Sequence, residues 1–301
     1  MLIRRSYDLS VPIEYCSRGR QIIFILRPHI SSIYLSVMSI FESIVLGLIQ
    51  GLTEFIPISS SGHLVIAQYF MSGASDHLFL EWINIGTVLA LIIFFRQRIW
   101  QAVLDIFQGK DYRLARNVLI AMLPAGIAGF LFADFIESNP FFGSVWTVVV
   151  TLALVGVLLV VLEKIPQLSP VKDSSDLPAP RALAIGLAQV AALVPGTSRS
   201  GSTIIAGRLA GLDRAKAAEF SFLVSIPIML GVIAKLCIKS ADRAYLIDNA
   251  LPLFIGNVVA LVSGLFAVGF LMRFLERHSL AVFGWYRIAL AGVLVVVLLL
   301  Q

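Results

Sequence analysis

The chain has 301 residues, of which 58% are hydrophobic and only 14% are charged. Soluble domains carry roughly 25% charged residues, so this composition excludes a soluble globular protein and indicates an all-α, polytopic membrane protein. The formal net charge of +5 requires no nucleic-acid partner, because basic residues gather at the ends of membrane spans.

The first 37 residues differ from the rest of the chain. They hold five arginines and two prolines, and their longest apolar run, IIFIL, is too short to cross a bilayer. We expect residues 1–37 to be an N-terminal extension outside the fold, with a surface amphipathic segment as the alternative. Residues 38–301 are expected to form a single membrane domain.

Six later segments are apolar and have the length of about 20 residues that a spanning helix needs. They lie at residues 78–95, 118–136, 143–162, 217–237, 251–272 and 281–300. Two further apolar regions, 40–72 and 182–211, are each interrupted in the middle by Pro, Gly and Ser. These two interrupted regions are too polar at their centres to be ordinary spans.

Lys and Arg predict the orientation of the spans, because they accumulate in cytoplasmic loops. The loop 96–117 holds five of them, and the connection 137–142 holds none. With 96–117 in the cytoplasm, region 40–72 begins and ends outside, and region 182–211 begins and ends inside. Each region is therefore predicted to be a re-entrant helical hairpin, and the two enter from opposite faces of the membrane.

The two interrupted regions resemble each other. Residues 47-GLIQGLTEFIPISSSG-62 match 186-GLAQVAALVPGTSRSG-201. Each repeat would contain one hairpin and three spans. Because an odd number of spans ends on the opposite side of the membrane from its start, the second repeat must have the opposite orientation. The sequence thus predicts an inverted-topology repeat, with repeat 1 at about 40–162, a flexible linker at about 163–181 and repeat 2 at about 182–301. Inverted repeats with broken helices are typical of transporters, so a lipid-phosphate flippase or ion-coupled transporter is the alternative to an enzyme.

Both interruptions are expected to face one polar cavity, because non-helical backbone at membrane depth is tolerated only inside protein or beside water. Gln50 and Glu54 lie four residues apart on one helical face, and Ser59, Ser60 and His63 follow them. The second region offers hydroxyls, backbone N–H groups at a helix start and one guanidinium: Thr197, Ser198, Arg199, Ser200, Gly201 and Ser202. This combination favours binding of a phosphate.

Charges within the membrane are costly, so Arg199 needs a counter-charge, and Glu54 can supply it if the two hairpins meet. A purely structural Arg–Glu pair is the alternative. A carboxylate, a hydroxyl and an imidazole also suit phosphoryl transfer: Glu54 can hold a divalent cation, Ser60 can attack, and His63 can move protons. Arg287 lies within the last span and is expected to pair internally.

At these residues the chain closely resembles the undecaprenyl-diphosphate phosphatase family, the bacitracin-resistance proteins. The matching motifs are 50-QGLTEFIPISSSGH-63, 195-PGTSRSGST-203, 217-AAEFSFLVSIP-227 and 286-YR-287, and the similarity runs from about Met38 to the C-terminus. The resemblance implies removal of the terminal phosphate from a C55 isoprenoid diphosphate, which recycles the lipid carrier for peptidoglycan. It also implies dependence on a divalent cation and a site that faces the periplasm from the bacterial inner membrane.

The resemblance implies a role for single residues. Gln50 and Glu54 fall on the family's Glu/Gln-x3-Glu motif, Ser60 and His63 on its serine and histidine, and Arg199 on its phosphate-binding arginine. We predict Glu54, Ser60, His63 and Arg199 as catalytic residues, and Glu54 with Gln50 as ligands of Mg²⁺ or Ca²⁺. The nucleophile is left open between Ser60 and a metal-bound water. Phosphate contacts are predicted for Ser59, Thr197, Ser198, Arg199, Ser200, Gly201 and Ser202.

The expected partners are a polyprenyl diphosphate lipid and the bilayer itself. No nucleic acid is expected, and a homodimer is one candidate assembly.

Overall fold

The computed structural model describes residues 39–71, 76–167 and 169–300, and the secondary structure of these ranges is helical. The predictions for residues 1–37 fall outside them. Five helices are long and apolar enough to cross a membrane: α6 (Arg113–Ser138), α8 (Val145–Leu162), α11 (Arg214–Ile238), α13 (Ala250–Arg277) and α14 (Ala281–Leu299). The segment with α3 (His77–Trp82) and α4 (Asn84–Phe94) bends by 69° into α5 (Arg96–Phe107), and it adds a sixth span if this bent pair crosses the membrane as one. The prediction of an all-α, polytopic membrane protein is confirmed, with five to six candidate spans in the described ranges.

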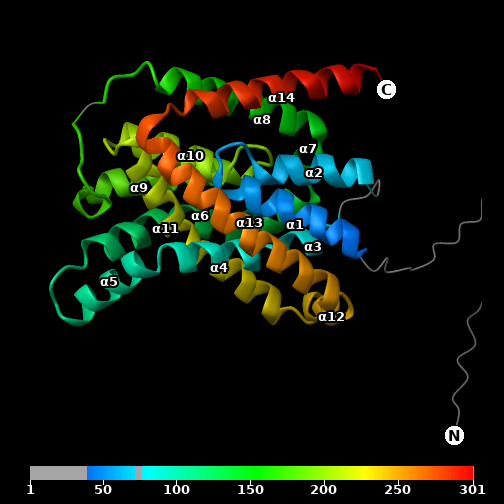
Figure 1. Ribbon diagram of the computed structural model, residues 1–301, viewed down its shortest axis with the longest axis horizontal. Coiled ribbons are helices and arrows are strands. Elements are labelled where there is room, and N and C mark those ends of the chain that lie inside the picture. The colour runs from blue at the N-terminus through cyan, green and yellow to red at the C-terminus, as the bar shows by residue number, and fades with distance from the viewer. Residues whose placement is uncertain (1–38, 72–75, 168, 301) are drawn as a thin grey trace, which may run out of the picture. The chain divides into compact units, whose positions relative to one another are not determined.

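The two interrupted regions form the predicted hairpins. The first joins α1 (Ile40–Phe55) to α2 (Ser60–Met71), and the second joins α9 (Ala179–Val190) to α10 (Arg199–Leu209). Arg181 near the start of α9 donates a hydrogen bond of 3.0 Å to the carbonyl of Ala210, just after α10, so the second hairpin returns to the side from which it started. In Figure 1, α1 and α9 run inward from opposite sides of the bundle.

Local sequence explains where the first hairpin begins and turns. Ser39 caps α1, because its hydroxyl accepts the N–H of Glu42 at 3.2 Å and the Glu42 carboxylate accepts the N–H of Ser39 at 3.1 Å. α1 ends at Phe55, since Pro57 disfavours a helical Ile56, which is extended at ψ 134°. We call residues 56–60 the first tip and residues 194–199 the second tip.

Helix packing follows the inverted repeat, because the first arm of each hairpin packs on a span of the other repeat. α1 packs on α13, where a Cβ at Gly47 would lie 2.5 Å from the carbonyl oxygen of Gly256. α9 packs on α6, where a Cβ at Gly186 would lie 2.4 Å from the carbonyl oxygen of Ala121. Small residues permit such close approach between helices in a membrane. The last spans of the two repeats, α8 and α14, lie side by side (Figure 1).

Short elements connect these helices: α7 (Pro140–Gly143), η1 (Ser174–Asp176), η2 (Ala191–Leu193) and α12 (Ser240–Asp248). The predicted repeat boundaries and the exclusion of residues 1–37 stay predictions.

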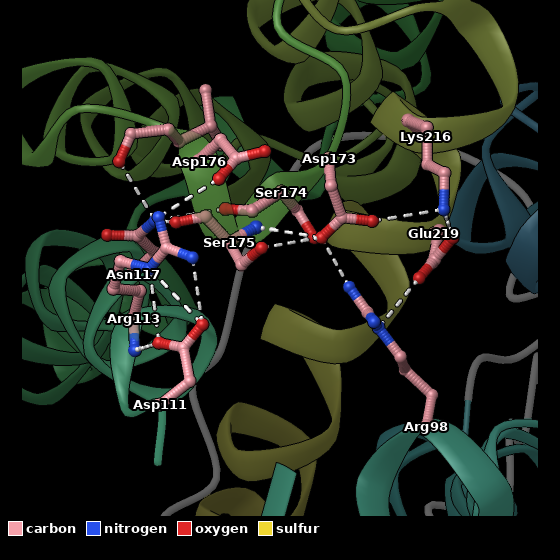
Figure 2. Close-up of polar contacts among 11 residues, drawn as sticks. Arg98, Asp111, Arg113, Asn117, Asp173, Ser174, Ser175, Asp176, Lys216 and Glu219 are labelled. Atoms are coloured by element: carbon pink, nitrogen blue, oxygen red, sulfur yellow. Dashed lines mark hydrogen bonds and ion pairs between the residues drawn. The ribbon is translucent and has the colours of Figure 1, made fainter. Parts of the chain in front are cut away.

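The linker that contains η1 is held by ion pairs, although its Pro/Ser/Asp composition predicts a flexible segment (Figure 2). The Asp173 carboxylate pairs with Arg98 and lies 3.2 Å from the Lys216 ammonium. Buried Asn117 donates to the carbonyls of Ser174 at 2.9 Å and Leu177 at 3.0 Å. The composition of the linker alone could not reveal these contacts, because Arg98, Asn117 and Lys216 come from three helices that are distant in the sequence.

The surroundings of Asp173 stabilise its charged form. Burial opposes ionisation, but the N–H and hydroxyl of Ser175 and the charges of Arg98 and Lys216 lower the pKa of Asp173 from its ordinary value to about 2. Because the folded-state pKa lies below the unfolded one, the carboxylate stabilises the fold above about pH 4, and this contribution disappears as the pH falls towards 2.

We expect Asp173→Asn to lower the free energy of unfolding at neutral pH by about 1–2 kcal/mol, a value reduced for partial solvent exposure. Thermal unfolding of the purified protein in detergent measures the loss, and the difference from the wild type should shrink below about pH 4. Asp176→Asn is the matched control, because Asp176 lies 3.1 Å from Arg113 and its side chain is 46% exposed. Equal losses for the two variants would contradict this account of the linker.

Candidate active site

The two tips meet at one carboxylate. Arg199, the first residue of α10, forms an ion pair with Oε1 of Glu54 at the end of α1. The hydroxyl of Ser60, the first residue of α2, donates to Oε2 of Glu54 at 2.5 Å. The side chains of Glu54 and Arg199 are only 11% and 22% exposed. The predicted counter-charge for Arg199 is therefore present, and a hydroxyl lies on the same carboxylate.

The turns before α2 and α10 share one backbone geometry. Ser59 and Ser198 both have positive φ, 75° and 74°, and both accept an N–H from the glycine three residues later. A non-glycine residue in this region costs roughly 1–3 kcal/mol, which is typical of functional sites. The turns place Ser60 and Arg199, which are equivalent in the two repeats, on opposite sides of one carboxylate. Ser198 is the residue that caps α10, so the helix starts at Arg199 and Gly201 lies within its first turn.

A cavity of about 200 Å³ lies between the tips, α4 and α11. One part of its wall is polar and contains Glu54, Ser60 and Arg199, while the other is apolar. Such a wall suits an anionic head group attached to a hydrocarbon chain. The lining residues are Glu54, Ser60, Ser61, Asn84, Ala192, Ser198, Arg199, Met229 and Val232.

Several predicted phosphate ligands lie outside the cavity lining. Ser59, Thr197, Ser200 and Ser202 are buried, with at most 8% of their surface exposed. The Ser202 hydroxyl donates to the Ser198 carbonyl at 3.0 Å, and the Ser200 hydroxyl donates to the Glu54 carbonyl at 3.4 Å. In this arrangement the serines shape the second tip, and their phosphate contacts stay predictions.

His63 also lies outside the cavity lining. Its Nδ1 lies 2.7 Å from the Ser59 carbonyl oxygen, and its Nε2 lies 2.7 Å from the Tyr286 hydroxyl. Because a carbonyl can only accept, Nδ1 carries a proton, and in the neutral imidazole Nε2 accepts from the Tyr286 hydroxyl. The two rings stack with centroids 5.7 Å apart. The catalytic role of His63 stays a prediction.

Arg287 connects both tips to the scaffold and confirms the expected internal pairing. It is fully buried, and its guanidinium donates to the carbonyls of Pro57 at 3.3 Å and Gly196 at 2.7 Å, one from each tip. Further hydrogen bonds reach the carbonyls of Leu152, Thr151 and Thr197. The sequence offered one signal for this role, an arginine inside an apolar span, but not its partners.

The donor set does not fit a resident divalent cation. Both oxygens of Glu54 are occupied, Oε1 by Arg199 and Oε2 by Ser60 and by the Gln50 amide nitrogen at 3.2 Å. No group of three or more His, Cys, Asp or Glu residues gathers anywhere in the described ranges. Mg²⁺ and Ca²⁺ prefer several oxygen ligands. Dependence on Mg²⁺ or Ca²⁺ and coordination by Glu54 and Gln50 stay predictions.

Comparison with known proteins finds relatives along most of the chain. A family model described as bacitracin resistance protein BacA matches residues 43–293, which include both tips. An undecaprenyl-diphosphatase of Rubrobacter xylanophilus is 39% identical over 276 residues, 88% of this chain and 100% of the relative. An undecaprenyl-diphosphatase of Acinetobacter baumannii is 40% identical over 264 residues, 86% of this chain and 95% of the relative. Undecaprenyl-diphosphatase 1 of Clostridioides difficile is 41% identical over 262 residues, 85% and 94% of the two chains.

Proposed function

The chain belongs to the bacitracin resistance protein BacA family, and we propose that it hydrolyses undecaprenyl diphosphate to undecaprenyl phosphate and inorganic phosphate. The observation that carries this proposal is the convergence of Glu54, Ser60 and Arg199, from two separate hairpins, on one cavity. The enzyme acts in the bacterial inner membrane, with the cavity towards the periplasm, and recycles the lipid carrier of cell-wall synthesis. Assembly as a homodimer stays a prediction.

Substrate binding uses the second tip. Arg199 exchanges part of its contact with Glu54 for the phosphate oxygens, and the first N–H groups of α10 add the positive end of a helix. The isoprenoid chain leaves along the apolar part of the wall, past Met229 and half-exposed Val232. This arrangement orients the terminal phosphorus towards the first tip.

Hydrolysis then proceeds by two displacements. The Ser60 oxygen attacks the terminal phosphorus, Glu54 takes the serine proton, and the proton passes to the bridging oxygen as its bond to that phosphorus breaks. Undecaprenyl phosphate leaves. Water next attacks the phosphoserine and gives its proton to Glu54, which returns a proton to Ser60 as inorganic phosphate departs. Arg199 stabilises the charge on the equatorial oxygens in both steps.

We expect Ser60→Ala to lower the turnover number by about 10³-fold or more, because the variant lacks the nucleophile. Acid quenching of the wild type during turnover should trap phosphoserine at position 60, detected by mass spectrometry. Ser61→Ala is the control, since Ser61 also lines the cavity but contacts the Ser59 hydroxyl and the Gly196 N–H rather than Glu54. Near-full turnover by Ser60→Ala would exclude the covalent route and leave water as the nucleophile.

A lipid-phosphate carrier is the second candidate, favoured by the inverted repeat. A carrier needs the anion-binding site, but it does not need a hydroxyl that is hydrogen-bonded to a carboxylate, as Ser60 is to Glu54. Phosphate release from undecaprenyl diphosphate by the purified protein in detergent with added Mg²⁺ separates the two functions. The phosphatase proposal requires release that depends on enzyme concentration. No release by a folded wild type would favour the carrier.

A further inference from the structure

Asn84, the first residue of α4, is held in one orientation by the backbone of the preceding helix, α3. Its side-chain nitrogen donates to the carbonyls of Leu80 at 2.9 Å and Glu81 at 3.3 Å. The side-chain nitrogen of Asn84 is therefore turned towards these carbonyls, and Oδ1, which can only accept, lies on the other side. This oxygen faces Gln50 on α1.

Gln50 connects Asn84 to the reacting carboxylate. Its side-chain nitrogen donates to Oδ1 of Asn84 at 2.7 Å and to Oε2 of Glu54 at 3.2 Å. Gln50 is only 1% exposed, so water cannot easily replace either bond. The same Glu54 oxygen accepts the Ser60 hydroxyl. A continuous chain of hydrogen bonds thus runs from Asn84 through Gln50 and Glu54 to the nucleophile.

The direction of these bonds restricts the residue at position 50. Two acceptor oxygens, one from Asn84 and one from Glu54, face it, so the residue must present two N–H groups. A carboxylate at position 50 would place its own acceptor oxygens against Oδ1 of Asn84 and Oε2 of Glu54, with no hydrogen to bond either. It would also add a second negative charge beside Glu54, where Arg199 now balances one.

We propose that Asn84 is a positioning residue for hydrolysis: it requires an amide at position 50 and, through Gln50, aims Oε2 of Glu54 at Ser60. This assignment rests on the proposed function. Gln50 then serves as a hydrogen-bond donor that fixes the general base. The site accordingly contains one carboxylate, that of Glu54. A second carboxylate at position 50, which would repel the negatively charged diphosphate, is absent.

The repeat supplies a matched control. Gln189 occupies the position in α9 that Gln50 occupies in α1, and it is 2% exposed. Leu193 stands four residues later, where the first hairpin has Glu54. Neither polar atom of the Gln189 side chain has a hydrogen-bond partner among the described residues. Replacing Gln189 by a side chain of similar volume should therefore leave catalysis intact.

The first test compares Gln50→Met with Gln189→Met in phosphate release from undecaprenyl diphosphate. We expect kcat to fall about 100-fold for Gln50→Met, because a displaced base misaligns the attack, while KM changes less than about threefold. Gln189→Met should keep both parameters within about threefold of the wild type. Thermal unfolding of each variant in detergent identifies a loss caused by misfolding.

The second test is a double-mutant cycle, which measures coupling directly. Gln50→Glu should lower kcat at least about 100-fold, because two oxygens oppose the new carboxylate. Adding Asn84→Gln should recover at least tenfold, since the longer amide can turn its N–H groups towards position 50. Gln50→Met with wild-type kcat, or independent effects in the cycle, would overturn the assignment of Asn84 alone. A folded wild type that releases no phosphate would overturn the proposed function and this assignment with it.

Discussion

Glu54→Gln is expected to lower kcat/KM for phosphate release from undecaprenyl diphosphate by about 10³-fold, within the usual range for loss of a general base. Ser60 donates its hydrogen to the Glu54 carboxylate at 2.5 Å, and an amide oxygen is a far weaker base. The same change removes the counter-charge of Arg199. Initial rates at several substrate concentrations in detergent would measure the loss.

Glu42→Gln provides the control for this prediction. Glu42 lies on the same helix as Glu54 but caps its exposed start, where glutamine can make the same capping bond. Its rate should stay within about threefold of the wild type, a change worth less than 1 kcal/mol. Comparable losses in the two variants would mean that the position of Glu54 between the tips has no special importance.

Arg287→Met is expected to lower the free energy of unfolding by about 3–5 kcal/mol, because several buried carbonyls would lose a charged donor together. Pro57 and Gly196 would both be affected, so the tips should also separate and turnover should fall about 100-fold. The midpoint of thermal unfolding in detergent and the rate of phosphate release report these two effects separately.

Arg273→Met is the matched control, because Arg273 is exposed near the end of α13. It should change the free energy of unfolding by less than about 0.5 kcal/mol. An unfolding midpoint for Arg287→Met equal to that of Arg273→Met would show that the carbonyl contacts of Arg287 do not hold the tips together.

Sequence patterns located the hairpins because each pattern has a direct physical cause. Pro57 and the serines interrupt an apolar helix at membrane depth, and a charge such as Arg199 is tolerated there only with a partner. The sequence therefore predicts Glu54 as that partner. The repeated Gly, Pro and Ser positions correspond to a shared backbone geometry of the two tips, since Ser59 and Ser198 have matching φ values.

Other features depend on tertiary contacts that no local pattern contains. His63 lies three positions after Ser60 on α2 but does not line the cavity. Its ring turns back onto the Ser59 carbonyl and stacks on Tyr286, which lies 223 residues further along the chain. The role of Gln50 was obscure for the same reason, since its partner Asn84 approaches from another span.

The position of the terminal phosphorus in the bound substrate tests the central claim most directly. A cryo-EM or crystal structure with a non-hydrolysable methylene analogue of undecaprenyl diphosphate would measure it. We predict that the terminal phosphonate lies between the two tips, with oxygens about 3 Å from both the Ser60 hydroxyl and the Arg199 guanidinium. A terminal phosphonate bound instead beside His63 and Tyr286, away from Arg199, would contradict the account.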